Sequence, residues 1–161
     1  MPVARDITAS YRGPGRVMRR LLGDGPREDR ALAFLMGACL LTFASQLPPL
    51  SRQAHLDPAI ELNALLAGAL FGWLFIAPLF LYALAALSHL IARLFGGQGS
   101  WYGARLALFW SFLASTPILL LNGLVRGFIG AGPAQWLVGL IWLGVFLWFW
   151  LTNLAVAERA A

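Results

Sequence analysis

The sequence contains no lysine, a single cysteine and two histidines, and charged residues make up only 12% of its 161 residues. Soluble domains average about 25% charged residues. Cys39 has no second thiol in the chain, which excludes an internal disulfide. Apolar residues make up 60% of the chain, so it has too little polar surface to cover a water-soluble fold. A soluble enzyme, a nucleic-acid-binding protein and a disordered chain are all disfavoured.

Residue patterns that build common reaction centres are also missing. The glycine cluster at 96–99 lacks the following lysine and hydroxyl residue that a phosphate-binding loop requires. His55, Asp57 and Glu61 share one loop and form a weak metal-ligand set, for which a solvated loop is the simpler interpretation. His89 has no visible catalytic partners, and a hydrogen-bonded histidine near an interface is favoured over a proton relay. We therefore expect no enzymatic activity, no metal and no cofactor.

Long uncharged stretches occupy most of the chain. Residues 31–51, 62–92, 106–125 and 127–157 each form an uncharged run of at least 20 residues. A helix needs about 20 apolar residues to cross a ~30 Å hydrocarbon layer, and in lipid only a helix or a closed barrel satisfies its backbone hydrogen bonds. We predict an all-α, polytopic membrane helix bundle. Its transmembrane domain, residues 26–161, has about four spans, at about 26–47, 59–95, 102–124 and 133–156.

Prolines and glycines mark the expected helix ends. Pro48 and Pro49 are expected to end the first helix and open a loop that continues to about residue 58. The second span is expected to be one helix kinked near Pro78, with a break into two half-helices as the alternative. Gly96, Gly97 and Gly99 are expected to end it. Pro117 is expected to bend the third span, and the hydroxyl residues just before it can bond the freed backbone. Residues 127–133 are expected to form a loop.

Arginine is concentrated at one expected side of the membrane. The first 30 residues hold seven arginines, and a cytoplasmic N-terminus places ten of the twelve inside. Cytoplasmic loops carry an excess of basic residues, so we expect a multi-pass protein of the cell inner (plasma) membrane with both termini cytoplasmic.

Residues 1–25 are expected to form a cytoplasmic, arginine-rich amphipathic arm. A helix after Pro14 places Val17, Met18, Leu21 and Leu22 on one side and basic side chains on the other. Such a helix is suited to lie on the inner leaflet, and its arginines would meet anionic headgroups. The alternative is a tail that only sets topology. The lipid-surface candidates are Arg16, Arg19 and Arg20.

Small residues recur at four-residue spacing in the second span, at Ala64, Gly68 and Gly72. This spacing lets two helix backbones approach closely in lipid. A packing face within the chain is the first interpretation, and a seam between two copies is the second.

One stretch, residues 90–108 continuing through 115–121, resembles the Yip family of Ypt/Rab-interacting membrane proteins, in its bacterial branch. The shared features are an arginine before a glycine-glycine turn, a serine-aromatic start to the next helix, and a Ser/Thr-Pro step followed by leucines. The residues that match are Arg93, Gly96, Gly97, Gly99, Ser100, Tyr102, Arg105 and Pro117.

The resemblance implies a multi-helix membrane domain with a cytoplasmic N-terminus and no catalytic residues. Eukaryotic relatives contact prenylated small GTPases in vesicle traffic. The family pattern usually has five spans, whereas four are counted here before Ala161. The favoured function is a non-enzymatic membrane organiser or adaptor that contacts the lipid bilayer and a membrane-protein partner or a second copy, and no nucleic acid. The alternative is a small transporter or channel subunit with a polar path lined by Pro78, His89, Pro117 and Asn122.

Overall fold

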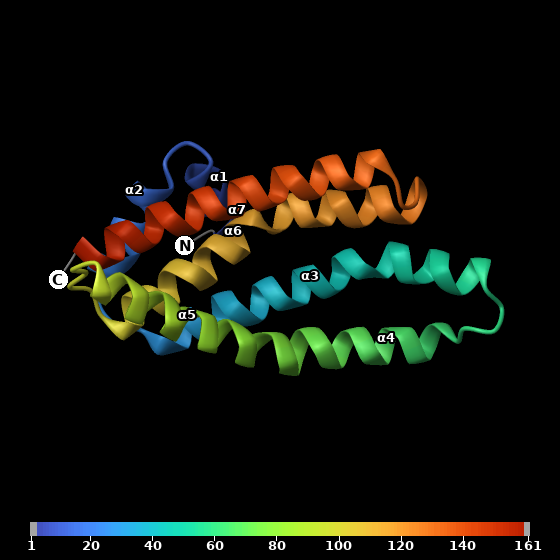
Figure 1. Ribbon diagram of the computed structural model, residues 1–161, viewed down its shortest axis with the longest axis horizontal. Helices are drawn as coiled ribbons and strands as arrows, with labels where there is room; N and C mark the ends of the chain where they lie inside the picture. The colour runs from blue at the N-terminus through green and yellow to red at the C-terminus, as the bar shows by residue number, and fades with distance from the viewer. Residues whose placement is uncertain (1–2, 160–161) are drawn as a thin grey trace.

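The computed structural model describes residues 3–159, and every regular element in that range is a helix. Two short helices, α1 (Val3–Ser10) and α2 (Pro14–Gly23), precede four long helical runs (Figure 1). The long runs are α3 (Glu28–Leu56), the continuous run of α4 (Leu62–Phe71), the π-helical segment η1 (Gly72–Ile76) and α5 (Ala77–Leu94), then α6 (Trp101–Phe128) and α7 (Pro133–Arg159). All four are long and apolar enough to cross a membrane, which confirms the predicted all-α membrane bundle.

Helix α6 is the centre of the bundle, because it packs against α3, α5 and α7. Its residues from 102 to 116 are buried almost without interruption, including Phe109 and Trp110. Neither α4 nor η1 has a fully buried residue, and both contact α3 on one side, which the bundle covers only partly. Both ends of the described chain lie at the same end of the bundle, with the α5–α6 turn (Figure 1). We call this the arm end, and the opposite end the distal end.

The first long helix does not end at Pro48 and Pro49 as the sequence predicts; it continues to Leu56. A proline inside a helix removes a backbone hydrogen bond and crowds the preceding turn. Here the tertiary contact compensates, because Gly123 and Gly127 of α6 leave space for the proline-containing turn. A Cβ at Gly123 would collide with the carbonyl oxygen of Ser45, and one at Gly127 would collide with Pro48. Helix α6 likewise extends to Phe128, so the loop expected from residue 127 starts later.

The other two helix prolines are accommodated in different ways. The turn before Pro78 widens into η1, where the N–H of Ala77 donates to the carbonyl of Gly72. The second span is therefore one unbroken helical run rather than two half-helices. At Pro117, the carbonyl of Leu113 loses its helical donor and accepts the Thr116 hydroxyl at 2.7 Å instead. The expected bonding of the freed backbone by a neighbouring hydroxyl is confirmed.

The regularly spaced small residues of α4 and η1 do not form a packing face within the described chain. Ala64 and Gly68 are exposed, and a Cβ at Gly68 or Gly72 would meet nothing within 4 Å. The first interpretation of their spacing is therefore wrong, and a seam between two copies stays a prediction. The close helix approach occurs instead at Gly123 and Gly127, which have the same four-residue spacing on α6.

Candidate functional site

The apolar face of α2 is buried against the bundle. Val17, Met18 and Leu21 have relative exposures of 4%, 0% and 3%. A Cβ at Gly15 would lie 3.2 Å from the Val156 side chain of α7, which shows how closely the two helices approach. The amphipathic pattern was therefore interpreted correctly as a helix with one apolar face. That face packs on α7 and not on lipid, whereas contact of the exposed arginines with lipid headgroups stays a prediction.

The segment before α2 is attached to the bundle by two specific hydrogen bonds. The Tyr11 hydroxyl donates to the carbonyl of Ala114 at 2.8 Å, and the Trp110 indole N–H donates to the Ser10 hydroxyl at 3.1 Å. The Tyr11 ring also packs edge-on against Phe149, with ring centroids 5.0 Å apart. Burial raises the pKa of the Tyr11 hydroxyl above 10.0, so it stays protonated as a donor. The arm is therefore a docked part of the fold.

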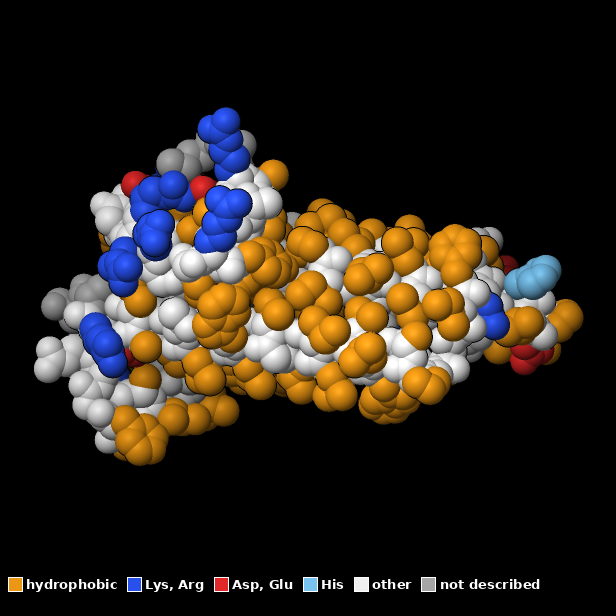
Figure 2. Space-filling view, turned by 90° about the horizontal axis from the view of Figure 1, so that it is seen from above, with side chains coloured by type: hydrophobic (Ala, Val, Ile, Leu, Met, Phe, Trp, Pro, Cys, Tyr) orange, Lys and Arg blue, Asp and Glu red, His pale blue; other side chains and the backbone are white. Residues whose placement is uncertain are grey.

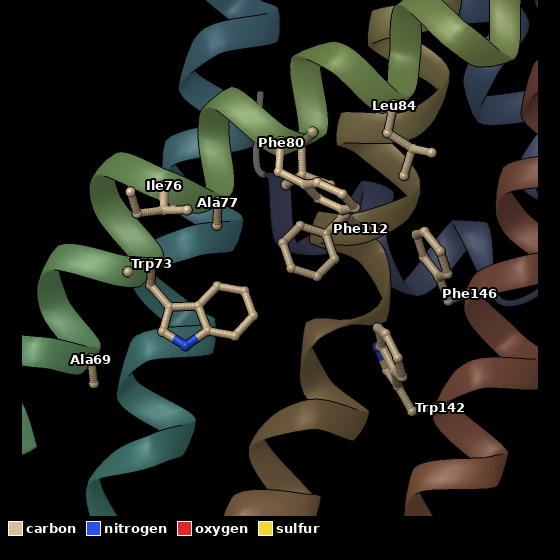
Figure 3. Close-up of a pocket in the computed structure, with 11 residues that line it drawn as sticks. Ala69, Trp73, Ile76, Ala77, Phe80, Leu84, Phe112, Trp142 and Phe146 are labelled. Atoms are coloured by element: carbon tan, nitrogen blue, oxygen red, sulfur yellow. The ribbon is translucent and has the colours of Figure 1, made fainter.

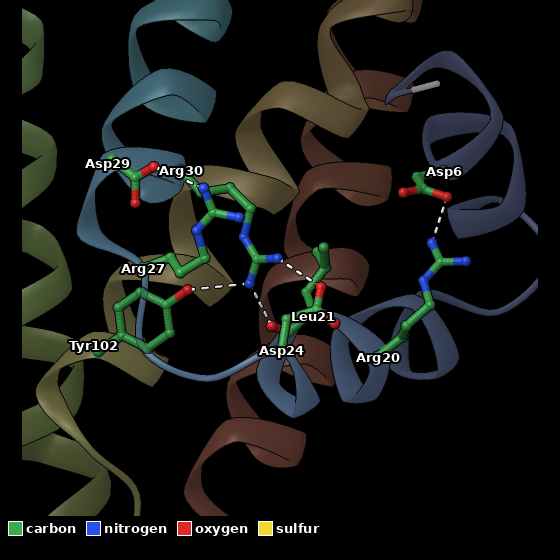
Figure 4. A network of polar contacts seen from close by, with 8 residues as sticks. All are labelled: Asp6, Arg20, Leu21, Asp24, Arg27, Asp29, Arg30 and Tyr102. Carbon is green, nitrogen blue, oxygen red and sulfur yellow. Dashed lines mark hydrogen bonds and ion pairs between the residues drawn. The ribbon is translucent and has the colours of Figure 1, made fainter. Parts of the chain in front are cut away.

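The outward face of the arm is basic. Arg16, Arg19 and Arg20, the lipid-surface candidates, are exposed on α2. Arg20 forms an ion pair with Asp6 of α1, and this pair fixes the two short helices against each other (Figure 4). Figure 2 shows arginine side chains gathered at the arm end, beside a surface that is otherwise largely apolar.

A second group of polar contacts joins the arm to α3 and α6. Arg30 donates to Asp24 at 2.7 Å, to the Leu21 carbonyl, and to the Tyr102 hydroxyl at 3.3 Å (Figure 4). Arg105 pairs with Glu28 at the start of α3. Two of the motif residues named from the sequence, Tyr102 and Arg105, thus hold the start of α6 against the start of α3.

The glycine turn between α5 and α6 closes one helix and opens the next. The Gly97 N–H donates to the Ala92 carbonyl at 2.8 Å, and the Gly96 N–H donates to the Arg93 carbonyl at 3.0 Å. This pair of bonds with Gly96 at φ +88° is a Schellman helix end, which favours glycine there. Ser100 then caps α6 by accepting the N–H of Gly103 at 3.0 Å. The prediction that these glycines stop the second helix is confirmed.

The same turn binds the end of α7 through Glu158, a residue that the sequence interpretation missed. One carboxylate oxygen of Glu158 accepts the Gly99 N–H at 3.0 Å, and the other lies 2.7 Å from Nδ1 of His89. The Gln98 N–H donates to the Glu158 backbone carbonyl at 3.0 Å. His89 and Glu158 are buried, with side-chain exposures of 1% and 7%.

Glycine is needed at this turn because the end of α7 approaches its backbone directly. A Cβ at Gly97 would lie 2.6 Å from a Glu158 carboxylate oxygen, and one at Gly99 would lie 2.6 Å from the Ala157 carbonyl oxygen. The order of the spans in the sequence could have indicated this contact. Consecutive spans cross the membrane in opposite directions, so the ends of the second and fourth spans lie on the same side of the membrane. That argument brings His89 and Glu158 to the same end of the bundle.

A family model, the Yip1 domain, matches residues 9–159. The chain belongs to the Yip1 family. The match covers the end of α1, the glycine turn and Glu158, so the features of the arm end lie inside the Yip1 domain. No curated protein matches the chain, and no solved structure matches it.

The interior of this Yip1 domain does not bring together the residues of the alternative polar path. His89 lies beside Trp101 at the arm end, with ring centroids 4.5 Å apart. Asn122 is 21 residues farther along α6 than Trp101, which is about 32 Å at 1.5 Å per residue. The His55, Asp57 and Glu61 side chains also form no metal-ligand group within the described residues.

One groove between the spans is apolar. A groove of about 560 Å³ lies between the second span and α7 and is lined by Trp73, Phe80, Phe112, Trp142 and Phe146 among others (Figure 3). Aromatic and aliphatic side chains make up its lining. Its chemistry is that of hydrocarbon and suits lipid chains better than ions or polar solutes.

Proposed function

We propose that this Yip1-family protein, of the bacterial branch, is a non-enzymatic membrane organiser or adaptor that works through its arm end. One observation carries the proposal: the arm, the α2–α3 junction, the glycine turn and the end of α7 form a linked polar assembly. Arg30 joins the arm and the α2–α3 junction to the start of α6 through Leu21, Asp24 and Tyr102, and Glu158 joins the adjoining glycine turn to the end of α7. The long spans between this assembly and the distal end are predominantly apolar.

The proposed orientation places the arm end in the cytoplasm and the protein in the inner membrane. Of the twelve arginines, only Arg52 and Arg126 belong to the distal end. An excess of basic residues marks the cytoplasmic side of membrane proteins. This asymmetry supports cytoplasmic termini.

The contacts of the buried polar groups favour an organiser over a transporter. Asn153 donates to the Ser111 hydroxyl at 2.9 Å, and the Trp142 indole N–H donates to the Ser115 hydroxyl at 3.1 Å. Polar groups that bond each other across helices hold those helices together. A transport pathway instead needs such groups to face a shared aqueous space.

Orientation is tested by placing one accessible cysteine at each end. Arg12→Cys and Gln53→Cys sit at exposed positions at opposite ends of the molecule, and Cys39 is buried. An impermeant maleimide should label Gln53→Cys in intact cells and Arg12→Cys only after permeabilisation. The reverse pattern would overturn the proposed orientation.

The adaptor role is tested by site-specific photo-crosslinking in native lipid nanodiscs, with mass spectrometry of the products. A photoreactive residue at exposed Arg93 in the arm end is compared with one at exposed Gln53 in the distal end. A stoichiometric protein partner crosslinked from position 93 and not from position 53 is expected. A lone protein at both positions, with solute flux in reconstituted vesicles that Pro78→Ala or His89→Ala abolishes, would replace the organiser by the transporter alternative.

A further inference from the structure

The two short helices of the arm enclose a hollow on their outer side, which we call the arm hollow. Its volume is about 560 Å³, within the usual range of small-ligand sites. Four arginines line it, two from α1 and the turn after it and two from α2. They are Arg5, Arg12, Arg16 and Arg20, with Asp6 as the one carboxylate in the lining.

The positive charge of the arm hollow is largely uncompensated. Asp6 is paired with Arg20. Within residues 3–159, the guanidinium groups of Arg5, Arg12 and Arg16 have no carboxylate within ion-pair distance and no hydrogen-bond acceptor. The next carboxylates in sequence are bound elsewhere: Asp24 by Arg30, Glu28 by Arg105 and Asp29 by Arg27. Three guanidinium groups therefore share one concavity without a counter-charge.

The start of α2 adds to this positive potential. Gly13, which lines the arm hollow, is the N-cap residue of α2 and provides no side-chain cap. No acidic residue occupies the first turn, and Arg16 stands there. The positive end of a helix dipole favours an anion and disfavours a basic side chain.

We propose that the arm hollow binds the phosphate group of an anionic membrane lipid. Guanidinium groups offer paired N–H donors that match phosphate oxygens. A lipid is favoured as the source because the arm packs on α7 of a membrane-spanning bundle. The turns of α7 next to the arm expose Trp148 (48%) and Leu151 (60%), against which acyl chains can lie. The proposal deepens the organiser role and rests on its placement of the arm end on the cytoplasmic side of the membrane.

The test is lipid binding to the full-length protein in neutral detergent, followed by native mass spectrometry. Phosphatidic acid is titrated against phosphatidylcholine, and Arg16→Gln is compared with Arg19→Gln. Both substitutions remove one exposed charge from α2, but Arg19 does not line the arm hollow. Each arginine in the hollow contributes about fivefold to phosphatidic acid affinity, at ~1 kcal/mol per residue near a charged surface.

Arg16→Gln should weaken phosphatidic acid binding about fivefold, Arg19→Gln less than twofold, and Arg5→Gln/Arg12→Gln/Arg16→Gln about 100-fold. Equal losses in Arg16→Gln and Arg19→Gln would replace the site by diffuse surface attraction. Equal binding of both lipids would also overturn the proposal. Displacement of phosphatidic acid by micromolar inorganic phosphate would assign the site to a soluble phosphate instead.

These outcomes are independent of the adaptor role. Crosslinking to a partner from position 93 can fail while Arg16-dependent lipid binding persists, and the reverse can also occur. Unchanged thermal unfolding of each variant confirms that the loss reports the arm hollow and not the fold.

Discussion

Replacing Gly99 by alanine is expected to release the end of α7 from the glycine turn. The new Cβ would lie 2.6 Å from the Ala157 carbonyl oxygen and 2.8 Å from Cα of Glu158, both backbone atoms. Non-bonded carbon contacts are favourable at about 3.5–4.0 Å, so the turn must move by roughly 1 Å. That shift breaks the bond from the Gly99 N–H to the Glu158 carboxylate and the bond from the Gln98 N–H to the Glu158 carbonyl.

The loss is about 3 kcal/mol, since a hydrogen bond to a charged group contributes about 1.5–3 kcal/mol and a neutral one about 1 kcal/mol. Hydrogen exchange with mass spectrometry measures it on peptides from the last turns of α7. A local loss of about 3 kcal/mol corresponds to exchange that is roughly 100-fold faster.

The matched control is Gly68→Ala in α4, where a Cβ meets nothing within 4 Å. This substitution should leave exchange in α7 unchanged, and should slightly stabilise its own helix because alanine is the better helix former. If Gly99→Ala leaves exchange at residues 152–159 within twofold of the parent protein, the close approach of α7 to the turn is not what holds them together.

Three further changes have expected outcomes. Glu158→Ala removes the acceptor of the Gly99 N–H and the partner of buried His89, and should lower the unfolding free energy by about 3 kcal/mol. Exposed Arg159→Ala should change it by under about 0.5 kcal/mol in the same thermal unfolding assay. Tyr11→Phe should loosen the arm by about 1 kcal/mol. Because burial raises the Tyr11 pKa, arm docking should be retained below pH 10 and decline as pH rises through the raised value, and Tyr11→Phe should abolish that dependence in hydrogen exchange of α1. Gly123→Ala should prevent normal folding, which would be seen as a loss of cooperativity in thermal unfolding. Gly144→Ala, where the new Cβ has open space, should unfold normally. A well-folded Gly123→Ala protein would contradict the α3–α6 contact.

The number and type of spans could be predicted because they depend on local composition. An uncharged run of 20 or more residues is visible in the sequence alone, and lipid leaves such a run few alternatives to a helix. The end of α5 at Gly96 and Gly97 could also be predicted, because its capping bonds join residues that are close in the sequence. The predicted helix end at Pro48 was wrong because Gly123 and Gly127 on another helix leave space for the proline-containing turn, which the local rule for proline does not include.

Contacts between distant residues were harder to predict, because one pattern suits several partners. The amphipathic face of α2 is equally suited to lipid and to protein, and only the fold shows that it packs on α7. Four-residue spacing of small residues occurs in both α4 and α6, but only Gly123 and Gly127 meet a neighbour. Glu158 stood alone at the end of a span, and its role depends on three groups from the α5–α6 region.

The docking of the arm has a consequence for biosynthesis. The ribosome makes α1 and α2 before α6 and α7, with which they are in contact, and Tyr11 and Ala114 are 103 residues apart in the chain. The apolar face of α2 therefore has no protein surface to cover it until the last two spans have been inserted. During that interval it is available to the lipid surface or to a chaperone, and its final docking marks the completion of the bundle. The order of synthesis thus makes the first segment of the chain the last to reach its place.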